Sequence, residues 1–524
     1  MGNAYERVRK QIVGWWEENG LACLAVFALS ILVYFPYLSD VLSNPDGVAW
    51  WDNPETPLWI LGQGRWGLYI SDYLKPPINL SPISTIWSLA LYSLGGMLFS
   101  CLLENKTLTT KVITGASIVC YPMVACTNTY WSCGFAIAFL LAMISVAVTV
   151  KAKNKLVGIL AGSVLLSVAV GNHQGQLSTA AGAGLMYLIA LLAREPEKFR
   201  EWLVKARDIL LMGLTGTTLY YIILQAMLQK YGMTLESYGG GDKITPRYIF
   251  TSLPTTIKNC YINFKNFFFS QNIMVNSYQV KPLYIFFFAL FAITLCLGIY
   301  RLRKKPLPCV ALVGCTILIP LFCSIVNLCT PDNPGVALHM TGGLCLFVPF
   351  IFSMFIYELQ SILGAKGALL RDVSILLALA LIWNFVLIDY ADAGLMLRTK
   401  DLTAAMANRA YCQIEMDERY SSGMKVLMIG RPDCSDYIGN GINYYDRTNG
   451  YARWGMMWAG EYNSLNGWST ILNHYVDGNI VTADWNDVDR IVAMEEFENM
   501  PIYPTEGCIK IIDDIFVVKM AETK

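Results

Sequence analysis

Three carboxylates lie close together in the segment that follows the first long apolar stretch of the chain: Asp46, Asp52 and Glu55. A carboxylate held near a bound hydroxyl group can remove its proton and act as a general base. The same segment continues into LWILGQGRWGLYI, where Arg65 could hold a phosphate oxygen through two hydrogen bonds. A base beside a phosphate-binding group would suit transfer from a phosphorylated donor to an alcohol. Alternatively, Arg65 only reaches from an interfacial helix to the membrane surface.

Further polar residues lie at the ends of long apolar stretches. His173 and Gln174 end one stretch, within NHQGQ, and His339 begins another. Each of them could face a substrate, or could simply cap the boundary of a helix. Both interpretations are kept.

Three basic residues fall in the long polar and aromatic segment 229–281. Arg247 follows a proline at a predicted helix start. Lys258 and Lys265 are seven residues apart and therefore share one helical face. They could bind a donor phosphate, or could meet the anionic headgroups of lipids.

The composition indicates which class of protein positions these residues. Of the 524 residues, 55% are hydrophobic and 15% are charged, and the mean hydropathy is +0.43. Soluble domains contain roughly 45–50% apolar and about 25% charged residues. The chain is therefore expected to be an α-helical polytopic membrane protein. Its net charge is zero, so nothing suggests a nucleic-acid partner.

A membrane-spanning helix needs about 20 mostly apolar residues. Residues 1–19 are expected to form an amphipathic helix on the inner surface, residues 20–390 the membrane domain and residues 391–524 a C-terminal domain. The predicted spans number eleven, at 20–38, 81–103, 112–128, 133–150, 156–172, 178–193, 207–228, 282–300, 308–329, 339–361 and 369–388.

The distribution of charge predicts the orientation. The loops on one side contain 19 basic residues, against eight in the loops on the other side before the C-terminal domain. The positive-inside rule makes the first side cytoplasmic. The large loops 39–80 and 229–281 and the C-terminal domain are then outside. From Asp392 onward, 12 Lys and Arg stand against 20 Asp and Glu, which fits a water-soluble domain.

The C-terminal domain is predicted to be small and of α/β type. A strand is expected at 424–430, a helix at 487–500, and a hairpin that turns at Asp513-Asp514. Cys412, Cys434 and Cys508 fall in this domain, and because their number is odd no disulfide is assigned.

Several function classes lack the residues that they need. An ion-coupled transporter normally has ionisable groups in the middle of its spans. Here Glu358 lies towards the inner end of its span, and Asp389 lies at the outer end of the last one. With only three histidines and no cysteine pair at metal-binding spacing, a zinc site is not expected.

Three segments, in this order, resemble one known family. Asp52 follows the first span and precedes Gly64-Arg65-Trp66, NHQGQLS (172–178) follows a middle span, and MPIYPTEGCIKIIDDIFVVKM occupies 500–520. The arrangement resembles the bacterial serotype-converting glucosyltransferases, multi-span enzymes that modify O-antigen and related surface glycans. Members often have two adjacent acids after the first span. This chain has Asp52-Asn53 instead, so the second acid is either dispensable or supplied by Asp46.

The resemblance implies a GT-C type fold of about eleven transmembrane helices with an extracytoplasmic α/β domain. It implies transfer of a hexose, commonly from undecaprenyl phosphate glucose, to a surface glycan on the outer face of the inner membrane. Asp52 would be the base, with inversion at the anomeric carbon, and Arg65 and Trp66 would frame it. Phosphate is a good leaving group, so no cofactor is expected, although the missing second acid leaves a divalent metal open.

The expected partners are the polyprenyl-phosphate-linked sugar donor, the glycan acceptor, the lipid bilayer, and a donor synthase and flippase that supply the donor. Two alternatives stay open. One is a related lipid-linked transferase that carries another sugar or acts on lipid A or teichoic acid. The other is a polyprenyl-linked glycan flippase, which should tolerate Asp52→Asn, whereas an enzyme should not. No physical feature of the sequence distinguishes glucose from its epimers.

Overall fold

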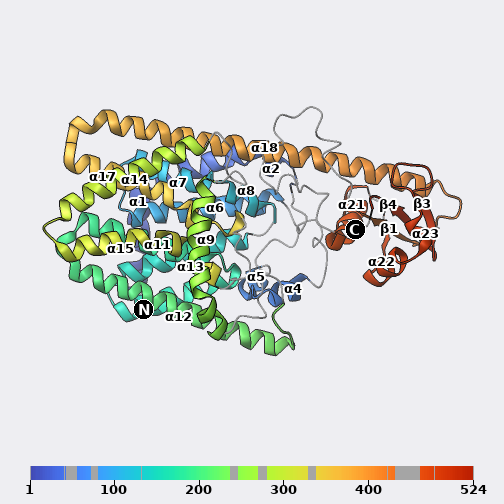
Figure 1. The fold of residues 1–524 in the computed structure, drawn as a ribbon, viewed down its shortest axis with the longest axis horizontal. Coiled ribbons are helices and arrows are strands. Elements are labelled where there is room, and N and C mark those ends of the chain that lie inside the picture. The colour runs from blue at the N-terminus through green and yellow to red at the C-terminus, as the bar shows by residue number, and fades with distance from the viewer. Residues whose placement is uncertain are drawn as a thin grey trace.

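The computed structural model describes residues 2–40, 42, 56–71, 81–130, 133–236, 246–269, 280–328, 338–421, 423–430, 461–476, 478 and 480–522. These residues form a large helical bundle and a small α/β domain, joined by one long helix (Figure 1). The predicted base Asp52, together with Asp46, Glu55 and Trp131, lies outside the described residues.

The bundle consists of helices connected mostly by short turns. Its elements are α1 (Gly2–Val33), α2 (Phe35–Ser39), α4 (Thr56–Gly62), α5 (Trp66–Ser71), α6 (Ser81–Leu102), α7 (Leu108–Val119), α8 (Pro122–Asn128), α9 (Gly134–Lys151), α10 (Lys155–Asn172), α11 (Gln176–Arg194), η2 (Pro196–Lys198), α12 (Phe199–Tyr231), α13 (Pro246–Phe269), α14 (Lys281–Leu302), α15 (Pro306–Cys323), η4 (Ile325–Leu328), η5 (Leu338–Met340), α16 (Gly342–Cys345), α17 (Phe347–Leu363), η6 (Gly364–Gly367) and α18 (Ala368–Glu415).

Within the described ranges, ten helices are long and apolar enough to cross a membrane, and eleven if α7 and α8 count as one bent span. The protein is thus a multi-pass membrane protein. The axes of α7 and α8 differ by 49°. Pro122 at the start of α8 explains the bend, because a residue before proline avoids the helical conformation. Tyr121 accordingly has φ −75° and ψ 135°.

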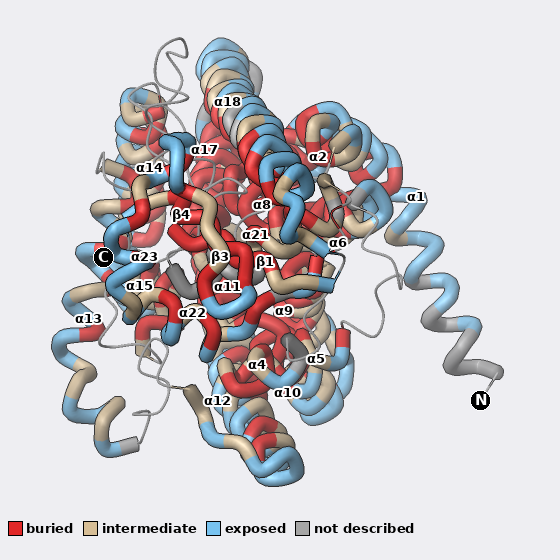
Figure 2. Tube along the Cα trace, turned by 90° about the vertical axis from the view of Figure 1, so that its right-hand side faces the viewer, coloured by how far each residue is buried: buried red, intermediate tan, exposed pale blue. Residues whose placement is uncertain are grey.

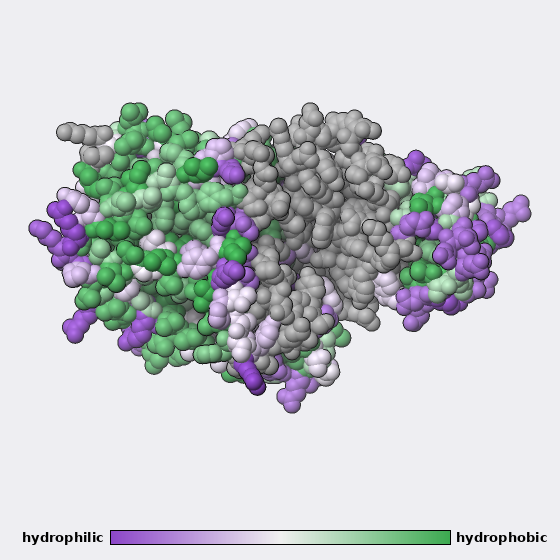
Figure 3. Space-filling view, in the orientation of Figure 1, coloured by the Kyte–Doolittle hydropathy of each residue, from purple (hydrophilic) through white to green (hydrophobic). Residues whose placement is uncertain are grey.

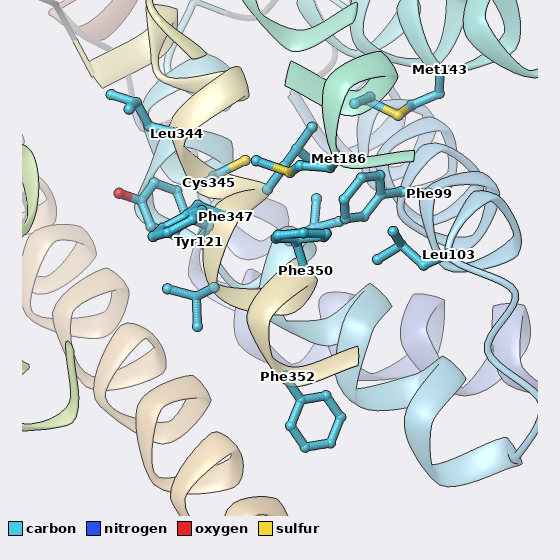
Figure 4. Close-up of a cluster of buried hydrophobic side chains, with 14 of the residues drawn as sticks. Phe99, Leu103, Tyr121, Met143, Met186, Leu344, Cys345, Phe347, Phe350 and Phe352 are labelled. Carbon is cyan, nitrogen blue, oxygen red and sulfur yellow. The ribbon is translucent and has the colours of Figure 1, made fainter. Parts of the chain in front are cut away.

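Burial divides the helices into a central and a peripheral set. Figure 2 shows buried segments of α9 and α11 in the middle and exposed ones on α1, α12 and α13 at the rim. The outer surface of the bundle is mostly hydrophobic (Figure 3), as a lipid-facing surface must be. At the centre, Phe347 and Phe350 of α17 pack with Phe99 of α6 and Met186 of α11 (Figure 4).

Two helices run through the domain boundaries expected from the sequence. α1 contains both the predicted surface helix 1–19 and most of the first span predicted at 20–38, whose end falls in α2, and α18 continues from the last span to Glu415. Neither stretch contains a proline, and α18 has a single internal glycine, Gly394. Nothing in these sequences therefore interrupts the backbone hydrogen bonding of a helix.

The C-terminal α/β domain, called the tail domain below, contains one mixed sheet. Its strands are β1 (Lys425–Ile429), β2 (Val481–Thr482), β3 (Ile509–Ile512) and β4 (Ile515–Lys519), in the order β2-β1-β4-β3. β1 pairs in parallel with β2 and β4, and β3 pairs with β4 in antiparallel fashion. The helices of this domain are α21 (Glu461–Tyr475), α22 (Trp485–Val492) and α23 (Glu495–Glu498).

Helices cover both faces of this sheet. One face packs against α21 and the end of α18, including Tyr411, and the other against α22 and α23. The predicted strand at 424–430 and the hairpin at Asp513-Asp514 are confirmed. Both aspartates have positive φ, 48° and 59°, as two-residue hairpin turns require. Cys412 and Cys508 are free thiols, and Cys434 lies outside the described residues.

The bundle has two ends, which the chain reaches alternately. The end that faces the tail domain, here called the tail-side end, carries α4, α5 and the C-terminus of α8 (Figure 1). The α10–α11 turn and η5 also lie there, because Gln174 in that turn is hydrogen-bonded to Gln63 after α4, and η5 packs against α8. The far end carries the turns after α6, α9, α11, α14 and α17, which contain most of the short-loop lysines and arginines.

Candidate functional site

The Gly-Arg-Trp segment forms a tight turn between the short helices α4 and α5. Gly64 has φ +80°, and a Cβ atom there would lie only 2.9 Å from the hydroxyl of Tyr220. That hydroxyl donates a hydrogen bond of 3.0 Å to the carbonyl of Gly64. The Nε2 amide of Gln174 donates one of 2.8 Å to the carbonyl of Gln63. The turn that presents Arg65 is therefore held by α12 and by the α10–α11 turn.

Trp66 locks α5 against the C-terminal end of α10. Its ring lies over Gly171, where a Cβ atom would come within 2.5 Å of the indole. A Cβ on Gly67 would lie 2.6 Å from the backbone nitrogen of Asn172. The Oδ1 atom of Asn172 also accepts a hydrogen bond of 2.8 Å from Ser71. The Gly-Arg-Trp and NHQGQ segments thus form one packed unit, which only glycines at these positions permit.

Four rings meet beside this unit, and we call them the histidine cluster: Tyr130, Phe135, His173 and His339. The ring centre of His173 lies 4.8 Å from that of Phe135 and 5.2 Å from that of His339. Tyr130 lies 5.7 Å from His339 and 5.2 Å from Phe135. The rings come from the end of α8, the start of α9, the α10–α11 turn and η5.

Both histidines of the cluster are electrically neutral near pH 7. Burial, and then the positive charge of Arg65, lower the pKa of His173 well below its usual value. The same two causes lower the pKa of His339 to about 3. A neutral imidazole offers one hydrogen-bond donor and one acceptor. Neither ring nitrogen of His173, however, has a partner in the part of the chain that the structure describes.

Two side-chain amides near the cluster also contain polar atoms without hydrogen-bond partners among the described residues. Asn128 ends α8, two residues before Tyr130, and Gln176 begins α11 with a backbone hydrogen bond of 3.0 Å to the carbonyl of His173. Both side chains are buried. Neither atom of the Asn128 amide group, nor Oε1 of Gln176, has a hydrogen-bond partner among the described residues.

Sequence reasoning missed Asn128 and Gln176. The available signal was their place in TNTYWSCG and NHQGQ, two polar turns at the same end of the bundle. It also treated Gln174 as a substrate-binding residue, and in the structure the amide of Gln174 holds the backbone turn before Arg65.

The basic residues of α13 lie elsewhere, on the surface. Arg247, Lys258 and Lys265 are all exposed. α13 packs against α15 and η4. At the exposed edge of this contact, Tyr261 donates a hydrogen bond of 2.7 Å to the carbonyl of Ile317 in α15. The structure thus brings Arg65, Trp66, His173, Gln174 and His339 together, and leaves the three basic residues of α13 at the periphery.

A buried acidic pair lies on the long helix α18. Asp389 and Asp392 of α18 are both buried. Asp389 accepts a hydrogen bond of 3.2 Å from the hydroxyl of Tyr34, which also donates one of 2.8 Å to the carbonyl of Val119. This hydroxyl therefore ties together α1, α7 and α18. Among the described residues, no group of three or more His, Cys, Asp or Glu side chains is placed to hold a metal ion.

Comparison with known proteins gives one match. The family model "Glucosyl transferase GtrII" matches residues 51–350, which is more than half of the chain. The match runs from the segment of Asp52 to the start of α17 and includes every residue of the histidine cluster. It leaves out Asp46 and the segment 500–520. No curated protein and no solved structure matches the chain.

Proposed function

This chain belongs to the glucosyl transferase GtrII family, and from that premise we propose that it moves glucose from a polyprenyl phosphate to a surface glycan. Transfer would take place on the outer face of the bacterial inner membrane, at the tail-side end of a GT-C type bundle. One observation carries the proposal. The backbone turn that presents Arg65 is held by hydrogen bonds beside a neutral, ring-lined cluster at the edge of an apolar helix bundle.

This arrangement suits a donor with a charged and an uncharged part. Within the packed unit of the Gly-Arg-Trp and NHQGQ segments, Arg65 supplies the positive charge. Its guanidinium can hold a phosphate through two hydrogen bonds. The polyprenyl chain would lie against the apolar surface of the helices. The sugar would then extend towards the acceptor and the base.

The reaction follows from these positions. Asp52 takes the proton from an acceptor hydroxyl, whose oxygen forms a bond to the anomeric carbon. The bond from this carbon to the phosphate oxygen breaks, and polyprenyl phosphate leaves with the electron pair. Attack from the face opposite the phosphate inverts the anomeric centre. Arg65 stabilises the charge that develops on the departing phosphate. Asp46 is the second acid of the loop, and no metal is required.

The proposed orientation rests on charge. Lys151, Arg194, Arg301 and Lys305 lie at the far end of the bundle, near turns rich in other basic residues. The positive-inside rule assigns that end to the cytoplasm, which leaves the tail domain and the exposed basic residues of α13 outside. There Arg247, Lys258 and Lys265 would meet lipid headgroups or the phosphate of an arriving donor.

The test compares Asp52→Asn with Asp46→Asn and wild type. Each protein is purified in detergent and incubated with polyprenyl phosphate [14C]glucose and membrane-extracted acceptor, with and without EDTA. Loss of a general base lowers turnover by about 10²- to 10⁴-fold, so we expect that loss for Asp52→Asn, unchanged melting temperature, and no effect of EDTA.

Each other outcome has a defined meaning. Full activity of Asp52→Asn combined with loss in Asp46→Asn would move the base to Asp46. Loss of activity in EDTA that Mg²⁺ restores would overturn metal independence. No turnover in wild type, together with transport of the lipid-linked sugar across vesicles, would replace the transferase by a flippase.

A further inference from the structure

Three buried side chains at the tail-side end carry polar atoms that nothing in the described structure satisfies. Asn128, His173 and Gln176 are 4%, 0% and 2% exposed. Five polar atoms of these side chains have no hydrogen-bond partner among the described residues: Nδ2 and Oδ1 of Asn128, both ring nitrogens of His173 and Oε1 of Gln176. Buried polar groups in native proteins are almost always hydrogen-bonded. Unsatisfied buried polar atoms also occur elsewhere in the described bundle, but five of them on two polar turns at one end indicate a ligand.

The three side chains belong to one place in the fold. Gln176 is joined to His173 through the backbone hydrogen bond at the α10–α11 turn. Asn128 is linked to the same turn through Tyr130 and Phe135, whose rings continue to His173. α8 also packs directly on η5, the turn of His339. Two segments more than 40 residues apart in sequence, 128–130 and 173–176, therefore meet at these rings, and both contain side chains with unsatisfied polar atoms.

The chemistry of these groups selects the kind of ligand. Amides and neutral imidazoles both donate and accept hydrogen bonds, as sugar hydroxyls do. None of the three carries a charge that would favour a phosphate or a carboxylate. The rings of Tyr130 and Phe135 add apolar surface of the kind that the C–H face of a pyranose contacts. Arg65, which supplies the nearby positive charge, lies at the edge of the cluster.

We propose that Asn128, His173 and Gln176 form the sugar subsite, which binds the hydroxyl groups of an uncharged hexose while Arg65 holds its phosphate. The inference rests on the proposed function. It adds that different residues bind the two parts of the donor, the sugar and the phosphate. It also makes the three residues the determinants of sugar preference. A donor that carries a uronic acid would find no cation to pair with among them.

The experiment uses substitutions that remove polar atoms and keep the volume: Asn128→Leu, His173→Phe and Gln176→Met. The matched control is Asn105→Leu at the far end, because the Asn105 amide is satisfied by Ser100, Thr114 and Ser353 at 3.0 Å each. Kinetics are measured with polyprenyl phosphate glucose, and inhibition is measured with polyprenyl phosphate that carries no sugar.

For the three subsite variants we expect KM for the donor to rise roughly tenfold, the effect of one or two lost hydrogen bonds. The inhibition constant of sugar-free polyprenyl phosphate should stay unchanged. The melting temperature of these variants should be equal to that of wild type or higher. Asn105→Leu should do the reverse, with a lower melting temperature and an unchanged KM. Discrimination between glucose and galactose donors should weaken in the subsite variants alone.

The outcomes separate the two proposals. If wild type turns over the donor and the three variants keep its KM and sugar preference, the polar atoms hold only water and the subsite is wrong. If the variants weaken sugar-free polyprenyl phosphate as much as the donor, the residues bind the phosphate instead. If wild type does not turn over any lipid-linked sugar, the proposed function itself fails.

Discussion

Two asparagines at opposite ends of the bundle are buried to a similar degree and have opposite surroundings. At the far end, the Nδ2 atom of Asn105 lies within hydrogen-bond distance, 3.0 Å, of three hydroxyls from α6, α7 and α17, and its two hydrogens are satisfied among them. Asn128 at the tail-side end has no partner for its amide group among the described residues. The first arrangement joins helices. The second stabilises nothing in the described structure, so its presence is better explained by a ligand than by folding.

The charged groups of the two ends show the same difference. At the far end, Arg301 donates a hydrogen bond of 2.9 Å to buried Glu358, and Arg194 lies 3.7 Å from Glu104. At the tail-side end, Arg65 approaches two histidines whose pKa values its charge helps to lower. Among the described residues no carboxylate pairs with Arg65, which is consistent with a guanidinium that binds an anionic ligand. This difference indicates which end performs the chemistry.

The largest effect is expected when one arginine is removed at each end of the bundle, which tests the difference between the charged groups of the two ends. Arg65→Leu should raise KM for the donor about 100-fold, since a hydrogen bond to a charged group is worth roughly 1.5–3 kcal/mol, and should weaken sugar-free polyprenyl phosphate equally. Arg194→Leu should lower the melting temperature and leave KM unchanged. Equal KM values for Arg65→Leu and wild type would contradict the proposal that the donor phosphate binds at the tail-side end.

A second substitution tests the packing that presents Arg65. Gly171→Ala places a methyl group against the ring of Trp66, and overpacking of this kind costs about 1–3 kcal/mol. We expect a lower melting temperature and lower activity, because α5 must move. Gly394→Ala is the control: its Cβ meets nothing within 4 Å, and alanine favours a helix by about 1 kcal/mol. If Gly171→Ala left the melting temperature and the activity unchanged, the close packing of Trp66 on Gly171 would not be required.

The pH dependence of stability should sharpen the contrast. Because the pKa of His339 is lowered in the folded protein, the unfolded chain binds a proton more readily below about pH 6.5. Stability should therefore be complete above that pH and decrease as the pH falls. The melting temperature is measured from pH 7.5 to 5, and His339→Phe should show a smaller decrease than wild type. Identical profiles would contradict a neutral, buried His339.

The smallest effect is expected from the exposed basic residues of α13. Lys258→Gln and Lys265→Gln remove charges at the surface, each worth about 1 kcal/mol of attraction to anionic lipid. KM for the donor should rise less than about fivefold in anionic vesicles and should not change in neutral detergent. A rise in detergent as large as that of Arg65→Leu would place these lysines in the phosphate site.

The sequence by itself determined the features that depend on local pattern. Stretches of about 20 apolar residues predicted a multi-pass helical protein, paired aspartates predicted the hairpin of the tail domain, and short motifs indicated the family that the match over 51–350 confirms. These features are readable because helix length, turn chemistry and glycine spacing are properties of neighbouring residues.

Only the tertiary structure decided the make-up of the candidate site. His173 and His339 are far apart in the chain, and their 5.2 Å approach depends on how four segments pack. The same packing uses Gln174 to hold a turn and leaves Asn128 and Gln176 without partners in the described structure. Whether a polar group has a hydrogen-bond partner depends on atoms from distant segments, so a local sequence pattern cannot predict it. That is why sequence reasoning found the segments of the site and His173, but not Asn128 and Gln176.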